Sequence, residues 1–167
     1  MHLRHAVVML AVLVAAGPAS SAGGGGGGGG GGSGTSGGPP PGAKSAELAR
    51  AEKLIEEKRW DEAVQVLTTE AERDRSNADV HNWLGYAERN RGDADAAFGH
   101  YARALALDPK HRGAHEYVGE AYLMVGDLAR AKEHLAVLAK LCRSRCEEYE
   151  DLKEHVEDYE ERHATAR

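Results

Sequence analysis

The residues of this 167-residue chain best suited to chemistry are its two cysteines, Cys142 and Cys146, which lie four positions apart. In an oxidising compartment a pair this close most simply forms a disulfide. Closing so short a loop stabilises a folded chain by only about 2 kcal/mol in the chain-entropy model, so we expect the bond chiefly to fix the angle between its flanking segments. It predicts a bend at residues 143–145, because two cysteines inside one regular helix would point apart.

Two other chemistries remain open for this pair. The flanking Arg143 and Arg145 favour the thiolate form that a redox-active pair needs. Two thiolates with a histidine would suit copper(I), and the chain has nine histidines, although none stands at ligand spacing beside the cysteines. The pair therefore predicts a structural disulfide, with a thiol-redox or copper-handling role as the alternative.

The histidines do not predict a metal site. His111 and His115 are four apart, but His111 falls in a turn, so we expect surface or packing roles. His81 and His115 are interpreted as residues at the edge of the core. The sequence also has no Ser-His-Asp arrangement, no paired carboxylates in an apolar setting and no cofactor fingerprint. We therefore expect no enzyme, with no catalytic residue, cofactor or metal.

The cysteines and histidines must be positioned by helices, which the sequence predicts from its apolar pattern. Between Ala78 and His111, two apolar runs recur at helical spacing on either side of Gly92-Asp93. Gly92 accepts a left-handed conformation at a helix end, and Asp93 can cap the next helix. Pro109 closes the unit, since it has no N–H to continue a helix. The runs are Val80, Trp83, Leu84 and Ala87, then Ala97, Phe98, Tyr101 and Leu105.

The same pattern returns when the sequence is shifted by 34 residues. Gly85, Gly92, Asp93, Ala97 and Tyr101 are matched by Gly119, Gly126, Asp127, Ala131 and Leu135. The backward shift reaches Ala51, Ala63 and Leu67. The pattern therefore predicts three helical hairpins in one register.

These residues resemble the tetratricopeptide repeat (TPR) family. The signature is Leu84-Gly85, Ala97, Tyr101, Ala104 and Pro109 in the middle unit, and Gly119, Tyr122, Gly126 and Ala131 in the third. The resemblance implies an all-α stack of three hairpins in a right-handed superhelix, with units at 44–77, 78–111 and 112–145. More narrowly, the segment from His111 to Tyr117, followed by Leu141-Cys142 and by Cys146 to Tyr149, resembles small exported proteobacterial repeat proteins with a two-cysteine capping helix.

The last hairpin needs a cover for its apolar face. We expect a capping helix within 146–163, since Tyr149, Leu152, Val156 and Tyr159 form a stripe on one helix face. Residues 147–167 hold nine acidic and three basic side chains, in a chain whose formal charge is −6. This acidity either keeps the cap soluble or docks a basic partner.

The N-terminal segment predicts export. Residues 1–22 have a short basic start, an apolar run from Ala6 to Ala16 and small residues before a cleavage site after Ala22, which is typical of a signal peptide. Eleven apolar residues are too few to span a bilayer, for which about 20 are needed. Residues 23–43, with the glycine tract from Gly23 to Gly32, are expected to form a disordered linker. The prediction is a periplasmic protein with no stable membrane insertion after cleavage.

The resemblance also implies a ligand groove lined by the first helix of each hairpin. The corresponding positions are Ser45, Leu48, Glu52, Ile55 and Glu56; Asp79, Asn82, Tyr86, Arg89 and Asn90; and Gly113, Glu116, Glu120, Leu123 and Met124. Some relatives grip a peptide's carboxylate here, but only Asn82 and Arg89 could do so, and Glu52, Glu116 and Glu120 would repel an anion. The favoured candidates are Asn82, Tyr86, Arg89, Asn90, Glu116, Glu120 and Leu123.

We therefore expect a protein or peptide partner, best an extended peptide with apolar and basic side chains, and no nucleic acid. The oligomeric state is left open, with a monomer preferred.

Overall fold

The computed structural model describes residues 44–142 and 146–164, and these form seven α-helices and no strand. The predicted signal peptide, the predicted linker and the predicted bend at 143–145 lie outside the described residues. The helices are α1 (Ala46–Glu56), α2 (Trp60–Arg73), α3 (Ala78–Arg91), α4 (Ala94–Leu107), α5 (Arg112–Met124), α6 (Leu128–Leu141) and α7 (Glu147–Ala164).

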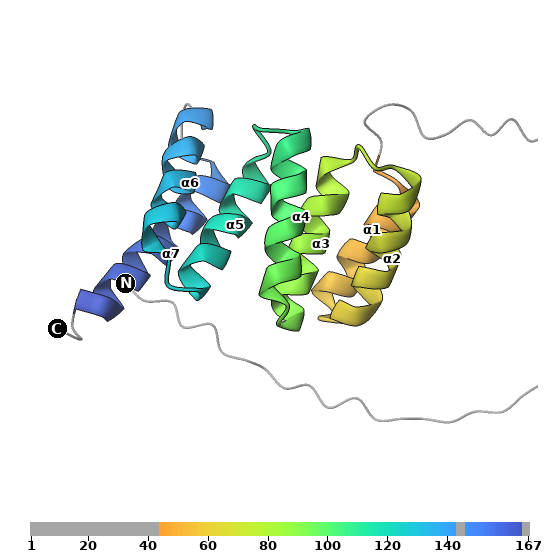
Figure 1. The fold of residues 1–167 in the computed structure, drawn as a ribbon, viewed down its shortest axis with the longest axis horizontal. Coiled ribbons are helices and arrows are strands. Elements are labelled where there is room, and N and C mark those ends of the chain that lie inside the picture. Colours follow the sequence, from red (N-terminus) through yellow and green to blue (C-terminus); the bar gives the residue numbers. More distant parts are fainter. Residues whose placement is uncertain (1–43, 143–145, 165–167) are drawn as a thin grey trace, which may run out of the picture. The chain divides into compact units, whose positions relative to one another are not determined.

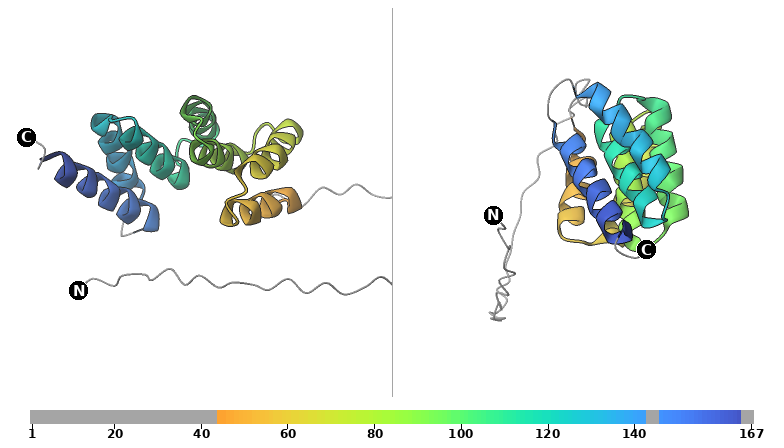
Figure 2. Two further views of the ribbon diagram at one scale, coloured as in Figure 1. Left: turned by 90° about the horizontal axis from the view of Figure 1, so that it is seen from below. Right: turned by 90° about the vertical axis from the view of Figure 1, so that its left-hand side faces the viewer.

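The helices form three successive hairpins, α1–α2, α3–α4 and α5–α6, and α7 packs against α5 and α6 (Figures 1 and 2). Each hairpin falls within one of the three 34-residue units. Neighbouring hairpins meet through α2 and α3 and through α4 and α5, while α3 also contacts α5. The predicted all-α stack of hairpins is confirmed.

The turns inside the hairpins repeat with the same period of 34 residues. Gly92 and Gly126 have φ angles of 98° and 83°, a region that glycine enters without steric cost. Lys58 stands at the corresponding position of the first hairpin and has a φ of 57°, which costs a residue with a Cβ about 1 kcal/mol or more. The turn of the first hairpin is therefore the least favourable of the three.

Helix caps show the same difference between hairpins. The side chains of Asp93 and Asp127 accept hydrogen bonds from the free amides at the starts of α4 and α6. Arg59, at the corresponding position before α2, makes no such bond through its side chain. A missing cap costs about 1 kcal/mol, so the first hairpin again matches the repeat pattern least well.

Close contacts between helices depend on small residues. A Cβ at Gly85 would lie 2.5 Å from a ring carbon of the fully buried Tyr101, on the other helix of the same hairpin. In the third hairpin a Cβ at Gly119 would lie 2.5 Å from Cδ2 of Leu152, which belongs to α7. The same repeat position therefore admits a side chain from its own hairpin in one unit and from the capping helix in the next.

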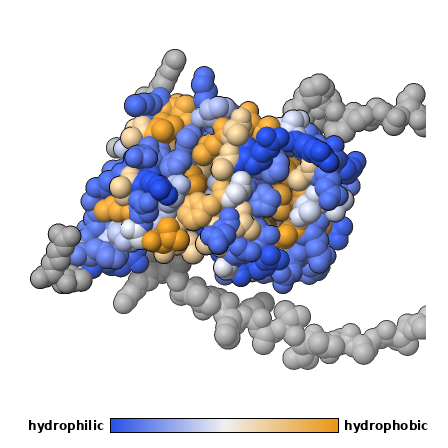
Figure 3. All heavy atoms as spheres, viewed as in Figure 1, coloured by the Kyte–Doolittle hydropathy of each residue, from blue (hydrophilic) through white to orange (hydrophobic). Residues whose placement is uncertain are grey.

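The capping helix buries Leu152 and Val156 in the core of the third hairpin, and Tyr149 packs at the edge of that core. Tyr159, the last residue of the predicted apolar stripe, is only partly buried. None of the helices at 44–142 and 146–164 combines the length and apolarity needed to cross a membrane. Figure 3 shows a largely hydrophilic surface on one face, with hydrophobic side chains gathered over α5 and α6 and beside α4.

Candidate functional site

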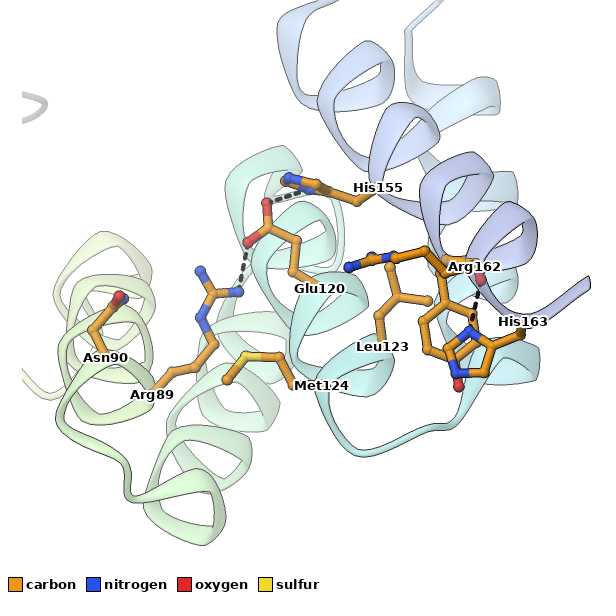
Figure 4. A pocket seen from close by; sticks show the side chains of 9 residues that line it. Arg89, Asn90, Glu120, Leu123, Met124, His155, Arg162 and His163 are labelled. Carbon is orange, nitrogen blue, oxygen red and sulfur yellow. Dashed lines mark hydrogen bonds and ion pairs between the residues drawn. The ribbon is translucent and has the colours of Figure 1, made fainter. Parts of the chain in front are cut away.

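A cavity of about 540 Å³ lies between α3, α5 and α7 (Figure 4). We call it the α5–α7 cavity. Apolar side chains of α5 and an aromatic ring of α7 line it together with charged and polar groups from all three helices. Its lining residues are Arg89, Asn90, Glu120, Leu123, Met124, His155, Tyr159, Arg162 and His163.

An ion network joins the three helices at this cavity. Glu120 of α5 lies between the other two helices, with Oε2 at 2.6 Å from Nη1 of Arg89 and Oε1 at 3.1 Å from Nδ1 of His155. Arg89 also donates to the backbone carbonyl of Tyr117 at 3.1 Å. The Arg89 side chain is only 9% exposed, so this pair is far less screened by water than a surface ion pair.

Aromatic rings hold Arg89 in place. Its guanidinium lies 5.1 Å from the ring centre of Tyr86 and 5.7 Å from that of Tyr117, which is cation–π distance. The rings of Tyr86 and Tyr117 are themselves 4.8 Å apart, and Trp83 packs against both. Tyr86 therefore stabilises the position of the Arg89 guanidinium through a cation–π contact.

Glu116 is the most unusual group near the cavity. It lies one helical turn before Glu120 on α5 and is only 8% exposed. Burial first, and then the neighbouring carboxylates of Glu120, Asp151 and Glu148, raise the pKa of its carboxyl to about 8, against a smaller opposing effect of Arg89. Glu116 is therefore mostly protonated at neutral pH.

The predicted groove residues fall into three groups. Arg89, Asn90, Glu120, Leu123 and Met124 line the α5–α7 cavity. Asn82 and Glu116 are buried and do not line it, and Tyr86 lies in the aromatic cluster.

The remaining predicted groove positions have structural surroundings. Leu48 and Ile55 are in the core, Ser45 caps α1, Glu52 pairs with Lys44 at 2.6 Å, Glu56 is exposed, Asp79 bonds to His111 at 2.9 Å, and Gly113 lies against Asn82.

Four cavity residues come from α7 and were missed by the sequence reasoning: His155, Tyr159, Arg162 and His163. Their spacing of four, three and one places them on one side of a helix, and Tyr159 also belongs to the predicted apolar stripe. That spacing was visible in the sequence. Which surface this side of the helix faces depends on how α7 packs against α5 and α6.

The two cysteines form a disulfide, with their Cα atoms 5.7 Å apart. Cys142 ends α6 and Cys146 immediately precedes α7, so the bond joins the end of one helix to the start of the next. A carboxylate oxygen of Glu148 lies within 4.8 Å of both sulfur atoms.

His111 and His115 are not brought together. The side chain of His111 caps α5, whereas His115 is buried, its Nδ1 lying 2.8 Å from Nδ1 of His134 and its Nε2 lying 3.1 Å from the carbonyl oxygen of Pro109. A carbonyl only accepts, so Nε2 of His115 carries a hydrogen. Burial, aided by His115, lowers the pKa of His134 to about 4. The pair is a contact between α5 and α6 in which His134 is neutral at pH 7.

A second cavity, also of about 540 Å³, lies between α4, α5 and α6 and is more apolar. Its lining includes Phe98, Leu105, Tyr122 and Val125. We call it the α4–α6 cavity.

Comparison with known proteins agrees with this geometry. The family model described as "Tetratricopeptide repeat" matches residues 89–155. The translocator chaperone SycD of Yersinia enterocolitica type III secretion has a similar structure, with a TM-score of 0.63 and 18% identity over 73% of this chain and 90% of that chain. PcrH in complex with the chaperone-binding region of PopD gives a TM-score of 0.62 at 18% identity over 70% and 90%.

A human protein is also similar. The second TPR domain of RPAP3 in complex with an HSP70 peptide has a TM-score of 0.58 and 20% identity over 66% of this chain and 92% of that chain. At these identities the likeness shows the fold. Taken with the family match at residues 89–155, it confirms the predicted resemblance to the tetratricopeptide repeat family.

Among curated proteins, a probable biofilm formation methyltransferase, WspC of Pseudomonas putida, is 39% identical over 56 residues. The match covers 34% of this chain and 13% of that protein, so the chain corresponds to a small part of its relative.

Proposed function

We propose that this chain is a non-enzymatic module that binds a protein or peptide in the α5–α7 cavity. The observation that carries the proposal is that five predicted groove positions and four residues of α7 converge on one cavity. PcrH with a region of PopD and RPAP3 with an HSP70 peptide are solved TPR structures of the same fold that hold peptide segments.

The apolar part of the lining favours an extended segment with apolar side chains. Leu123, Met124 and Tyr159 supply apolar surface, and Met124 is 68% exposed. Methionine adapts to ligands of different shape because its side chain is unbranched and polarisable. Glu120 is the one acidic side chain of this lining, and Arg89 and His155 already contact its carboxylate.

The proposal is tested with two variants of neighbouring residues. Met124 lines the α5–α7 cavity, whereas Val125, which is 55% exposed, lines the α4–α6 cavity. Peptides are first selected on the full chain from a display library of random dodecapeptides. We expect Met124→Asp to lower their affinity at least tenfold, since it puts a charge on an apolar contact surface, and Val125→Asp to leave it unchanged.

Two results would count against the proposal. If the library yields no peptide that binds the chain, the protein is not a peptide-binding module of this kind. If Val125→Asp weakens binding and Met124→Asp does not, the partner occupies the α4–α6 cavity.

We also propose that the protein is exported to the periplasm. Residues 1–22 have the composition of a signal peptide, and a disulfide such as Cys142–Cys146 persists in oxidising compartments. The expected mature N-terminus is Gly23. N-terminal sequencing of the protein released by osmotic shock tests this, and recovery of the intact chain from the cytosolic fraction would contradict it.

A second candidate function, thiol-redox or copper handling, is favoured only by the closeness of Cys142, Cys146 and Glu148. It requires the disulfide to be reduced, because a disulfide sulfur is neither nucleophile nor thiolate ligand. Thiol titration of the protein from its native compartment separates the two functions. Free thiols or bound copper would favour the second candidate.

A further inference from the structure

One wall of the α4–α6 cavity is formed by Gly99, a glycine inside α4 that the hairpin stack does not require. A Cβ at this position would meet no other atom within 4 Å. Unlike Gly92 and Gly126, Gly99 does not have a positive φ angle. The corresponding positions of the other two hairpins hold Gln65 and Glu133. Because glycine inside a helix is destabilising relative to alanine, neither packing nor backbone geometry explains it, and its effect is to leave space between two hairpins.

The lining of this space suits a flat molecule. Of the nine residues that line the α4–α6 cavity, only Tyr122, Arg130 and His134 have polar side chains. The ring centre of Tyr122 lies 4.8 Å from that of Phe98 and 5.7 Å from that of His134, so aromatic faces gather on one side. The volume of about 540 Å³ lies within the range of small-molecule sites, which is about 300–1,000 Å³.

His134 gives the cavity a hydrogen-bond acceptor. Nε2 of His115 donates to the carbonyl oxygen of Pro109, so with both rings neutral its Nδ1 accepts, and Nδ1 of His134 donates across the 2.8 Å contact. A neutral imidazole that donates through Nδ1 accepts through Nε2. Within residues 44–142 and 146–164 no hydrogen bond reaches Nε2 of His134. This nitrogen is therefore available to a molecule in the cavity that His134 lines.

The charges of the lining favour a neutral ligand. Among the described residues that line the cavity none is acidic, so a cationic ligand would find no carboxylate there. Arg130, the lining residue with a permanent charge, has its Nε 3.3 Å from Asp127 and its guanidinium 5.3 Å from the ring centre of Tyr122. A peptide segment would also bring backbone N–H and C=O groups, which need partners that a mainly apolar lining does not supply.

We propose that the α4–α6 cavity binds a small neutral aromatic molecule that carries a hydroxyl or a ring N–H, such as a phenol or an indole, and that Nε2 of His134 accepts the hydrogen bond from this donor. The ring of the ligand lies against Phe98 and Tyr122, in the space that Gly99 leaves open. The site is separate from the α5–α7 cavity and does not depend on the proposed peptide-binding function.

The experiment is calorimetry on the full chain at pH 7, with indole and phenol as probes. The controls are 1-methylindole and anisole, which have similar shapes and lack the hydrogen-bond donor. We expect one indole or one phenol to bind per chain, and each control to bind about tenfold more weakly, because it leaves Nε2 of His134 without a partner. N-acetyltryptophanamide, an indole attached to peptide groups, should bind no more tightly than free indole.

Variants test the acceptor and the space separately. His134→Phe keeps a flat ring without an acceptor, so it should lower the affinity for indole to that for 1-methylindole and leave the latter unchanged. Gly99→Leu should lower the affinity for indole at least tenfold by filling the cavity. Glu133→Leu, the same side chain at the corresponding and exposed position of α6, should leave it unchanged. Val125→Asp should weaken indole binding, and Met124→Asp, in the other cavity, should not.

Four results would overturn the inference. Neither probe binds; indole and 1-methylindole bind equally well; or His134→Phe lowers the affinity for both by the same factor, which would show a purely structural role for His134. The fourth is tighter binding of N-acetyltryptophanamide than of indole, since the ligand would then be a side chain of a protein. The peptide selection on the α5–α7 cavity is judged by its own variants, so either proposal can fail while the other stands.

Discussion

Replacing Glu116 by glutamine should stabilise the protein, and by an amount that depends on pH. The pKa of this carboxyl is 4.5 in an unfolded chain and about 8 in the folded protein. Because the folded state holds the proton more tightly, the contribution of Glu116 to stability is fully present below pH 4.5 and is lost as the pH rises toward 8. Glutamine has the shape of the protonated carboxyl and does not titrate, so the variant escapes this loss.

The size of the effect follows from the width of the pH window. Between pH 4.5 and 8 the equilibrium constant for folding falls by up to about tenfold for each pH unit. At pH 7 the advantage of Glu116→Gln reaches roughly 3 kcal/mol, and the melting temperature should rise by roughly 10 °C. Near pH 4.5 the two proteins should be almost equally stable.

Urea unfolding of the wild type and of Glu116→Gln at pH 5, 6, 7 and 8 measures this difference directly. Glu133→Gln serves as the control, since its side chain is exposed on α6 and its stability should follow that of the wild type at every pH. A stability difference between Glu116→Gln and the wild type that stays constant over this range would refute the reasoning, because a constant offset reports packing and not a linked proton.

Three further predictions concern the stack. Gly119→Ala should lower the free energy of unfolding by about 1–3 kcal/mol, because the new Cβ would lie 2.5 Å from Leu152. Gly99→Ala, whose new Cβ meets no other atom within 4 Å, should raise the free energy of unfolding by up to about 1 kcal/mol. Urea unfolding measures both changes, and two changes of the same sign would contradict this prediction. The folded pKa of His134 is lowered to about 4, so its contribution to stability is present above pH 6.5 and is lost as the pH falls to 4; His134→Gln should flatten this part of the unfolding profile, and an unchanged profile counts against it. Reducing the Cys142–Cys146 bond should lower stability by about 2 kcal/mol, as measured by urea unfolding with and without dithiothreitol, and no change in dithiothreitol would show that the bond does not constrain the unfolded chain.

The fold was predictable because its signals are local and repeated. Gly92 and Gly126 mark left-handed turns and Asp93 and Asp127 cap the helices that follow, each pair 34 residues apart. Such signals act through neighbouring residues and need no knowledge of tertiary contacts. The exception is Lys58, which takes the glycine conformation because the two helices it joins, α1 and α2, pack together as the other hairpins do.

The candidate site was only half predictable, for a physical reason. Residues of α3 and α5 such as Arg89 and Glu120 face the cavity because the repeat fixes which side of those helices is turned inward. The orientation of α7 has no repeat to fix it. The orientation of α7 depends on the packing of Leu152 against Gly119, 33 positions earlier in the chain. Neither residue type predicts this contact. For the same reason the burial of Glu116 could not be foreseen, since α7 supplies two of its acidic neighbours.

The two ends of α7 are held by different kinds of force. A covalent bond fixes the backbone just before Glu147, while His155, Tyr159 and His163 belong to the later turns, which are held only by noncovalent contacts such as the pairs His155–Glu120 and Lys132–Glu160. Amide hydrogen exchange should therefore become steadily faster along α7 toward Ala164. The wall of the cavity would then open at the last turn of α7, so a ligand would enter there without the first turn having to move.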